Sequence, residues 1–201
     1  MSRVTGKRRT IGGRARILDA ALAVFAARGY DAASIAEIGE RAGIAKSVMY
    51  HHFGSKRGLY EAILESRTEE LVQRVEAVLA EDPDAPRLRP GLDAYLAFLQ
   101  EYPRVWELLY RDPPLDSDVR AVYENQRRRR TQAIADLITP AVAAEADPAA
   151  KRLHTELLIT AVRAFTAWWH DHPEVPRERV LDAILAFATA GAQHLPVPTR
   201  R

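Results

Sequence analysis

The glycines and prolines of this chain are segregated, and their distribution limits the folds that it can adopt. Eight of the ten glycines lie at or before Gly58, and all twelve prolines lie at or after Pro83. Both residue types interrupt helices, so we expect short helices with tight turns first and longer helices between proline-rich breaks afterwards. The sequence has no alternating strand pattern longer than a few residues and no fixed-period repeat. It therefore predicts an all-α protein.

Charge is distributed unevenly along the chain. The formal net charge is only +2, but residues 1–60 hold 11 Lys and Arg against 4 Asp and Glu, a net +7. The remaining residues hold 18 basic against 23 acidic side chains, a net −5. This asymmetry favours a polyanion-binding N-terminal part and a second part with another task. A solvated basic tail is the alternative.

Composition favours a cytoplasmic protein. The 201 residues are 47% hydrophobic, which is enough for a packed core, and none is cysteine, as expected for a reducing compartment. The basic start has no apolar stretch behind it, so we do not expect a signal peptide. The longest uncharged run, 183–199, contains two prolines, a glutamine and a histidine, which makes a membrane span improbable.

The N-terminal part is expected to hold a pair of short helices joined by a glycine turn. Ser34 and Glu37 form a capping box that begins a helix, and Gly43 ends it. Another helix is expected over about 45–52. Two short helices with this turn are a helix-turn-helix unit.

Longer helices flank this pair. The first is expected over about 14–28, where apolar residues recur at helical spacing and Gly29 follows the end. The fourth is expected to begin at Ser55 and continue to about Ala80.

The helix over 45–52 has a polar face in addition to the side that packs on the core. A recognition helix directs its N-terminal side chains to base edges, while Lys, Ser and Tyr also bind phosphates. Ser34 at the preceding helix start and Lys56 at the fourth helix could each hold a further phosphate. Ordinary solvent exposure is the alternative for each residue. The predicted DNA-contact set is Ser34, Lys46, Ser47, Tyr50, His51 and Lys56.

Residues 16–64, "RILDAALAVFAARGYDAASIAEIGERAGIAKSVMYHHFGSKRGLYEAIL", resemble the tetracycline-repressor-like (TetR) family of bacterial transcription regulators. The resemblance implies that the glycine-turned pair binds a palindromic operator in double-stranded DNA. It also implies a helical C-terminal body that dimerises and binds a small molecule, and the same six residues as DNA contacts. One departure is Arg57, at a position often acidic in the family, followed by Gly58, which costs helix propensity.

Together these inferences predict three parts. Residues 1–13 form a flexible basic arm that is either disordered or lies along the DNA, and 14–60 form the helix-turn-helix headpiece. Residues 61–201 form a helical effector-binding and dimerisation domain.

Two later helices are unusually apolar. They are expected over about 149–170 and 177–193, and the second has Asp182 as its only charge between Val180 and Ala192. A helix that is apolar nearly all round must be buried on more than one side. We therefore expect the two helices to pair with their copies in a homodimer, so that two headpieces read two half-sites. The alternative is the internal core of a monomer.

An aromatic-rich region lies between the headpiece and these helices. Apolar side chains with a few hydroxyl groups are typical of ligand pockets, so a small hydrophobic effector is predicted here. A filled core is the alternative. The proposed lining residues are Tyr95, Phe98, Leu99, Trp106, Leu109, Tyr110, Tyr123 and Phe165.

Other functional classes find little support in the sequence. It has no nucleophile triad or phosphate-binding glycine loop, so an enzyme is not expected and no cofactor is predicted. Adjacent histidines such as His51 and His52 point apart on a helix, so a metal site is not expected either. The run Arg127–Arg130 is expected to be a solvated, ion-paired face. The protein is thus expected to act on the nucleoid as a repressor. An activator, or a DNA-binding regulator or architectural protein without an effector, stays open.

Overall fold

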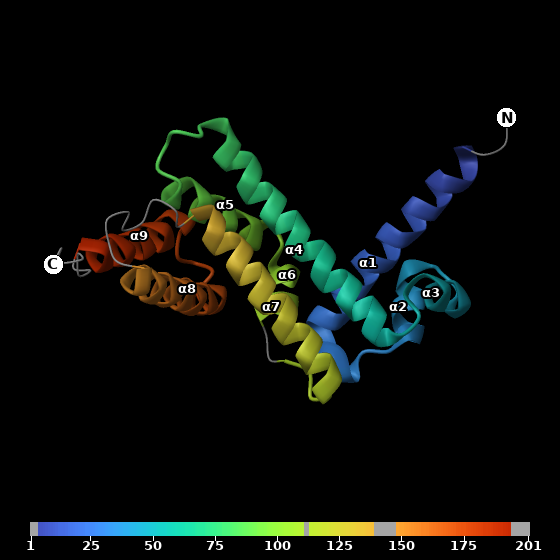
Figure 1. The fold of residues 1–201 in the computed structure, drawn as a ribbon. Coiled ribbons are helices and arrows are strands. Elements are labelled where there is room, and N and C mark those ends of the chain that lie inside the picture. The colour runs from blue at the N-terminus through green and yellow to red at the C-terminus, as the bar shows by residue number, and fades with distance from the viewer. Residues whose placement is uncertain (1–3, 111–112, 139–147, 194–201) are drawn as a thin grey trace. The chain divides into compact units, whose positions relative to one another are not determined.

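The computed structural model describes residues 4–110, 113–138 and 148–193, and every regular element within them is an α-helix (Figure 1). This confirms the all-α prediction. In the described residues, no helix is long and apolar enough to span a bilayer. The helices are α1 (Val4–Ala32), α2 (Ile35–Ala42), α3 (Lys46–Phe53), α4 (Lys56–Glu81), α5 (Leu88–Glu101), α6 (Pro103–Tyr110), α7 (Ser117–Ile138), α8 (Pro148–Asp171) and α9 (Arg177–Gln193).

The chain folds into two compact units, which α4 and α7 both enter. The first unit comprises residues 1–69 and 102–127, and the second comprises residues 70–101 and 128–201.

In the first unit, α1 packs against α2 and α6, and α2 packs against α3. The apolar positions that the sequence assigns to the inner faces of these helices are buried, so the short helices share one core. Its fully buried side chains include Ile17, Ala21, Phe25, Ile38, Met49, Leu59 and Ile63.

Helix α1 begins at Val4 rather than at the predicted Arg14, so the backbone of the segment predicted as an arm is helical from Val4. The side chains of residues 4–12, and with them the basic groups of that segment, lie outside the described ones. Gly29 lies within α1 instead of after it, but its φ of 71° and ψ of 173° interrupt the helical geometry there. A positive φ suits glycine because it has no Cβ, so the predicted break is present as a kink.

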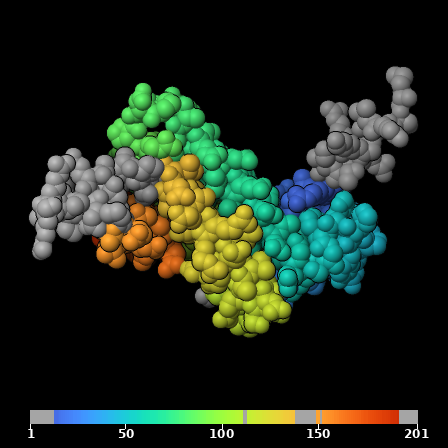
Figure 2. All heavy atoms as spheres, viewed as in Figure 1, coloured from blue at the N-terminus to red at the C-terminus, as the bar shows by residue number. Residues whose placement is uncertain are grey.

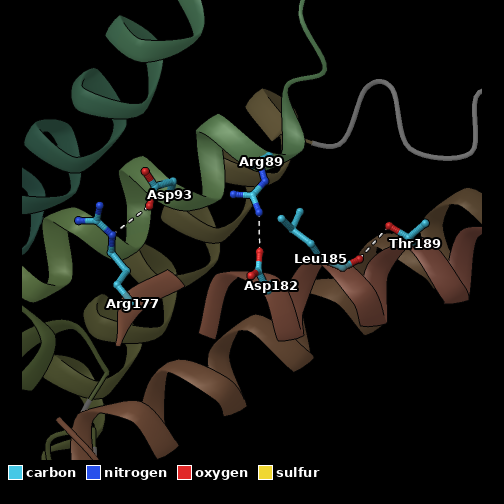
Figure 3. Close-up of polar contacts among 6 residues, drawn as sticks. All are labelled: Arg89, Asp93, Arg177, Asp182, Leu185 and Thr189. Carbon is cyan, nitrogen blue, oxygen red and sulfur yellow. Dashed lines mark hydrogen bonds and ion pairs between the residues drawn. The ribbon is translucent and has the colours of Figure 1, made fainter. Parts of the chain in front are cut away.

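In the second unit, α9 packs against α5 and α8. Two ion pairs join α5 to α9: Arg89 with Asp182, and Arg177 Nε with Asp93 Oδ1 at 3.0 Å (Figure 3). Asp182, the charge that interrupts the apolar run of α9, therefore has a partner on α5. Farther along α9 the Thr189 hydroxyl donates to the Leu185 carbonyl at 2.8 Å (Figure 3).

The arginine run of α7 is only partly solvated, contrary to the prediction. Arg127 pairs with Glu124 at 2.6 Å, and Arg128 and Arg129 are exposed, but Arg130 is only 2% exposed. Consecutive side chains point around a full helical turn, so one of four neighbours faces inward when one side of the helix is packed.

Candidate nucleic-acid interface

Capping fixes where the helix pair begins and turns. Ser34 Oγ accepts the Glu37 N–H at 3.1 Å, which satisfies one of the free N–H groups at the start of α2. Gly43 ends α2 with φ 64°, and the next N–H, that of Ile44, donates to the Gly39 carbonyl at 2.9 Å. This is the left-handed glycine termination that the sequence predicts.

Gly39 makes the tight turn possible. A Cβ at this position would lie 2.9 Å from the Ile44 carbonyl oxygen and 3.1 Å from Met49 Sδ. The absence of a side chain at Gly39 lets α3 approach α2. The Met49 side chain fills the space between the two helices and is only 1% exposed. Because Met49 faces the core, the opposite face of α3 is turned to solvent.

That outward face holds four of the six predicted DNA-contact residues: Lys46, Ser47, Tyr50 and His51 are all exposed. Lys46 and Tyr50 lie one turn apart, with the ammonium 5.7 Å from the ring centroid. The atoms of α2 and α3, in blue-green to cyan, form an outer surface in Figure 2. The structure thus brings a cation, two hydroxyls and an imidazole together on one accessible helix face.

The start of α3 is open to an external acceptor. Its N-cap residue is Ala45, whose methyl side chain cannot accept from the first N–H groups of the helix. The positive end of the helix therefore has no side-chain cap, and Lys46 is the first residue of the helix. A shallow hollow on this surface is lined by Ala36, Gly39, Glu40, Gly43, Ile44, Ala45 and Lys46.

Ser34 and Lys56, the other two predicted contacts, already have partners. The Ser34 oxygen caps α2, although the residue is exposed and its O–H can still donate. The Lys56 ammonium donates to the Asp31 carbonyl at 3.1 Å and lies 4.5 Å from the Tyr30 ring centroid. Its half-buried position lowers the pKa of Lys56, which nearby Asp31 partly offsets.

Sequence reasoning missed several residues that shape this interface. The Arg14 guanidinium lies 5.7 Å from the Phe53 ring centroid and so links α1 to the end of α3. Arg28 Nε pairs with Glu37 at 3.0 Å, which ties α1 to the first turn of α2. Periodicity within one helix gives no signal for such contacts between helices.

The residues predicted to line a pocket divide between the two units, and a pocket formed by them stays a prediction. In the first unit the Trp106 and Tyr110 rings stack with centroids 6.3 Å apart, and the buried Tyr123 hydroxyl donates to the Leu109 carbonyl at 3.2 Å. In the second unit, three of them share the buried face of α5 and one is half-buried on α8. These four are Tyr95, Phe98, Leu99 and Phe165.

Among the described residues, no group of three or more His, Asp and Glu side chains is arranged to hold a metal ion. The His51 and His52 rings are edge-on to one another, with centroids 5.7 Å apart.

Known proteins share both parts of this architecture. Residues 17–63 match the model of the family "Bacterial regulatory proteins, tetR family", and residues 85–191 match "Tetracyclin repressor-like, C-terminal domain". The HTH-type transcriptional activator FasR of Mycolicibacterium smegmatis is 31% identical over 92% of this chain and 84% of its own.

Solved structures have the same fold. A TetR-like transcriptional regulator from Rhodococcus sp. RHA1 superposes with a TM-score of 0.72 at 24% identity, over 90% of this chain and 96% of its own. FadR of Bacillus subtilis, solved in complex with stearoyl-CoA, gives a TM-score of 0.69 at 15% identity, over 89% of this chain and 95% of its own. With both family domains matched and a relative this similar along its length, the chain belongs to the tetR family of bacterial regulatory proteins and is a DNA-binding transcription regulator, not an enzyme.

Proposed function

We propose that this protein is an effector-responsive repressor that binds a palindromic operator as a homodimer and acts on the nucleoid in the cytoplasm. The observation that carries the proposal is the outward face of α3, where Lys46, Ser47, Tyr50 and His51 are exposed together opposite the buried Met49. A helix of this kind can enter a major groove with its core side still packed.

The six predicted contacts take different roles in this proposal. Lys46 can bind guanine acceptors or a phosphate, and Ser47, Tyr50 and His51 can donate to phosphates or base edges. Ser34 presents its hydroxyl with the N-terminus of α2 to a phosphate. Lys56 contributes positive charge at the start of α4 while it remains bonded to Asp31.

Homodimerisation is supported by an apolar surface in the second unit. On α8, Leu153 and Leu157 are 65% and 61% exposed, and Trp168 lies on the same helical face. On α9, Phe187 is also exposed, among small alanine side chains. Exposed large apolar side chains that share a face are typical of protein interfaces. A two-fold partner would cover them and would place two copies of α3 on two half-sites.

The operator follows from that symmetry. Duplexes selected by the full-length protein from a random pool should contain an inverted repeat, with half-site centres about 10 base pairs or a multiple of this apart. Enrichment of single, unrepeated sites would argue against binding as a dimer. A failure to enrich any sequence would overturn specific DNA binding.

A small hydrophobic effector is proposed for the aromatic-rich region. The buried face that Tyr95, Phe98 and Leu99 share on α5 supplies apolar surface in the second unit. The fold that this chain shares with FadR accommodates stearoyl-CoA in that protein. Helix α4 enters both units and can transmit the bound state to the headpiece as a shift in population.

Stearoyl-CoA, a short-chain acyl-CoA and free coenzyme A are suitable probes. Stearoyl-CoA should raise the melting temperature and lower the affinity for the selected duplex, whereas coenzyme A should do neither. Equal operator affinity in the presence of every compound that binds would overturn the effector response. It would then favour the alternative, a regulator or architectural protein without an effector.

An activator is the second candidate, because FasR, which is similar over most of this chain, is named as one. The direction of regulation depends on where the operator lies relative to the promoter. Transcription in vitro from a promoter that carries the selected operator, with and without the protein, distinguishes the two.

A further inference from the structure

Asp31, near the end of α1, holds two other segments of the first unit through different atoms. Its backbone carbonyl accepts from Lys56 Nζ, at the start of α4, at 3.1 Å. Its side-chain Oδ2 accepts the Leu115 N–H, just before α7, at 3.0 Å. One residue therefore contacts both the helix that follows the recognition helix and the segment that leads into α7.

Asp31, Lys56 and Leu115 form a joint between α1, α4 and the segment before α7. Packing holds the α4 side of this joint in place. Lys56 lies over the Tyr30 ring, and that ring packs against Tyr60 with centroids 4.9 Å apart. Tyr60 in turn meets Phe25 edge-on, with centroids 5.1 Å apart. A displacement of Asp31 would therefore also shift Lys56 and the aromatic cluster of Phe25, Tyr30 and Tyr60.

The α7 side is fixed by its own hydrogen bonds. Asp116 Oδ1 accepts the N–H groups of Asp118 and Val119 at 2.9 and 3.1 Å, and so caps α7. Arg120 Nε donates to the Pro114 carbonyl at 3.0 Å. These bonds join the residues around Leu115 to the first turn of α7, so the Asp31 contact holds the helix as well as the loop.

The electrostatics of Tyr30 agree with this arrangement. Burial raises the pKa of Tyr30, and the carboxylates of Asp116 and Asp31 raise it further, while Arg57 of α4 partly offsets them. The Asp116 carboxylate at the start of α7 therefore acts on a tyrosine of α1.

We infer that Asp31 is a positioning residue that couples α7 to DNA affinity, because it fastens the start of α7 to the headpiece beside Lys56. Helix α7 continues from the first unit into the second, so it offers a route to the headpiece besides α4. This inference rests on the proposed function and adds a route for its regulation. It needs no knowledge of the effector, since α7 can be perturbed by substitution.

A double-mutant cycle tests the coupling. Asp116→Ala loosens the first turn of α7, and its effect on affinity for the selected duplex is measured in the wild-type and Asp31→Ala backgrounds. In the wild-type background Asp116→Ala should weaken binding about fivefold, which is about 1 kcal/mol of binding free energy. In the Asp31→Ala background the same substitution should change binding by less than about 1.5-fold. Equal effects in both backgrounds would overturn the inference.

Two further backgrounds separate positioning from general destabilisation. Asp31→Asn keeps an acceptor oxygen for Leu115, so Asp116→Ala should regain its full effect there. Asp19→Ala removes another exposed α1 carboxylate, which bonds Arg67 of α4 at 2.7 Å, and should leave the effect of Asp116→Ala unchanged. Loss of the effect in the Asp19→Ala background would show that any weakened α1 abolishes it, and would also overturn the inference.

The same cycle is read without DNA by amide hydrogen exchange at residues 30–35 and 55–60. Asp116→Ala should speed exchange there in the wild type but not in the Asp31→Ala background. If the wild type selects no duplex while this exchange pattern holds, the proposed function fails and the joint stands. If duplexes are bound and exchange is additive, the joint fails and the proposed function stands.

Discussion

Tyr50 projects from α3 with 43% of its surface exposed, while its neighbour Met49 is 1% exposed. An exposed aromatic ring adds little to folding, so its removal should act mainly on binding. We expect Tyr50→Ala to weaken operator binding about tenfold, which is about 1.4 kcal/mol, without changing the melting temperature or the oligomeric state. Tyr50→Phe separates the hydroxyl from the ring. Unchanged affinity in Tyr50→Ala would mean that α3 does not lie in the groove as proposed.

Lys46 and Lys56 should respond differently to the loss of their charge. Lys46 is exposed, whereas Lys56 bonds the Asp31 carbonyl and lies over Tyr30. If both meet phosphates, Lys46→Met and Lys56→Met should each reduce the slope of log affinity against log salt by about one. Only Lys56→Met should also lower the melting temperature, because it leaves the carbonyl and the ring without their cation. An unchanged melting temperature in that variant would contradict the structural role of Lys56.

Gly58 illustrates why a glycine stands where helix propensity disfavours it. A Cβ at this position would lie 2.1 Å from the Phe53 carbonyl oxygen, whereas no described atom lies within 4 Å of a Cβ built at Gly13. Gly58→Ala should therefore destabilise the protein by about 1–3 kcal/mol, because the backbone between α3 and α4 must move. Gly13→Ala, also within a helix, should be neutral or stabilise by up to about 1 kcal/mol. Urea unfolding of both variants provides the measurement.

At the scale of elements, helix ends with local signals could be predicted. Ser34 caps α2, and Ser55 Oγ accepts the Gly58 N–H at 2.9 Å at the start of α4, as their positions before apolar periodic runs suggest. The bounds of α9 agree with the predicted range. These signals are local because a cap bonds residues only two or three positions away.

Other features depend on residues far apart in the sequence and could not be predicted from local patterns. Asp31 meets Lys56 and Leu115 across 25 and 84 positions. No local pattern in the sequence therefore indicates that the Lys56 ammonium already bonds the Asp31 carbonyl. The early start of α1 has a different cause: the apolar spacing that predicts this helix lies after Arg14, whereas the backbone is already helical from Val4, through Gly12 and Gly13. A glycine weakens a helix without preventing it.

The contact between α8 and α9 predicts a pH dependence. His154 is buried on α8, its Nε2 has no hydrogen-bond partner among the described residues, and its ring lies against Gly191 of α9. Burial lowers the pKa of His154 below its usual 6.5. The unfolded chain therefore takes up a proton that the folded chain resists, so stability falls as the pH drops below 6.5.

His154→Leu should remove this contribution. Between about pH 7.5 and about pH 5.5 the variant should lose less unfolding free energy than the wild type. Denaturant unfolding at each pH measures the difference. A parallel loss in the two proteins would show that His154 is protonated equally in the folded and unfolded states.

At the scale of the whole molecule, the proposed mode of DNA recognition depends on joining two headpieces. A single headpiece offers one recognition helix and a few phosphate contacts, and such binding is weak and salt-sensitive. Linking two of them by a two-fold axis raises the effective concentration of the second headpiece once the first is bound. In the proposed function, the exposed apolar face of α8 and α9 and the polar face of α3 are therefore parts of one mechanism.

Leu157→Glu tests that dependence, because it places a charge in the centre of the exposed α8 stripe. The variant should have half the wild-type mass in light scattering and should bind the selected operator at least about 100-fold more weakly, since the avidity is lost. Leu115→Glu is the matched control for mass, since Leu115 is 79% exposed but belongs to the first unit, whereas α8 and α9 belong to the second. If Leu157→Glu kept the wild-type mass, the exposed stripe would not be the dimer interface. If it became monomeric with full operator affinity, paired headpieces could not be the source of specificity. If Leu115→Glu also halved the mass, the interface would lie elsewhere than on the exposed stripe.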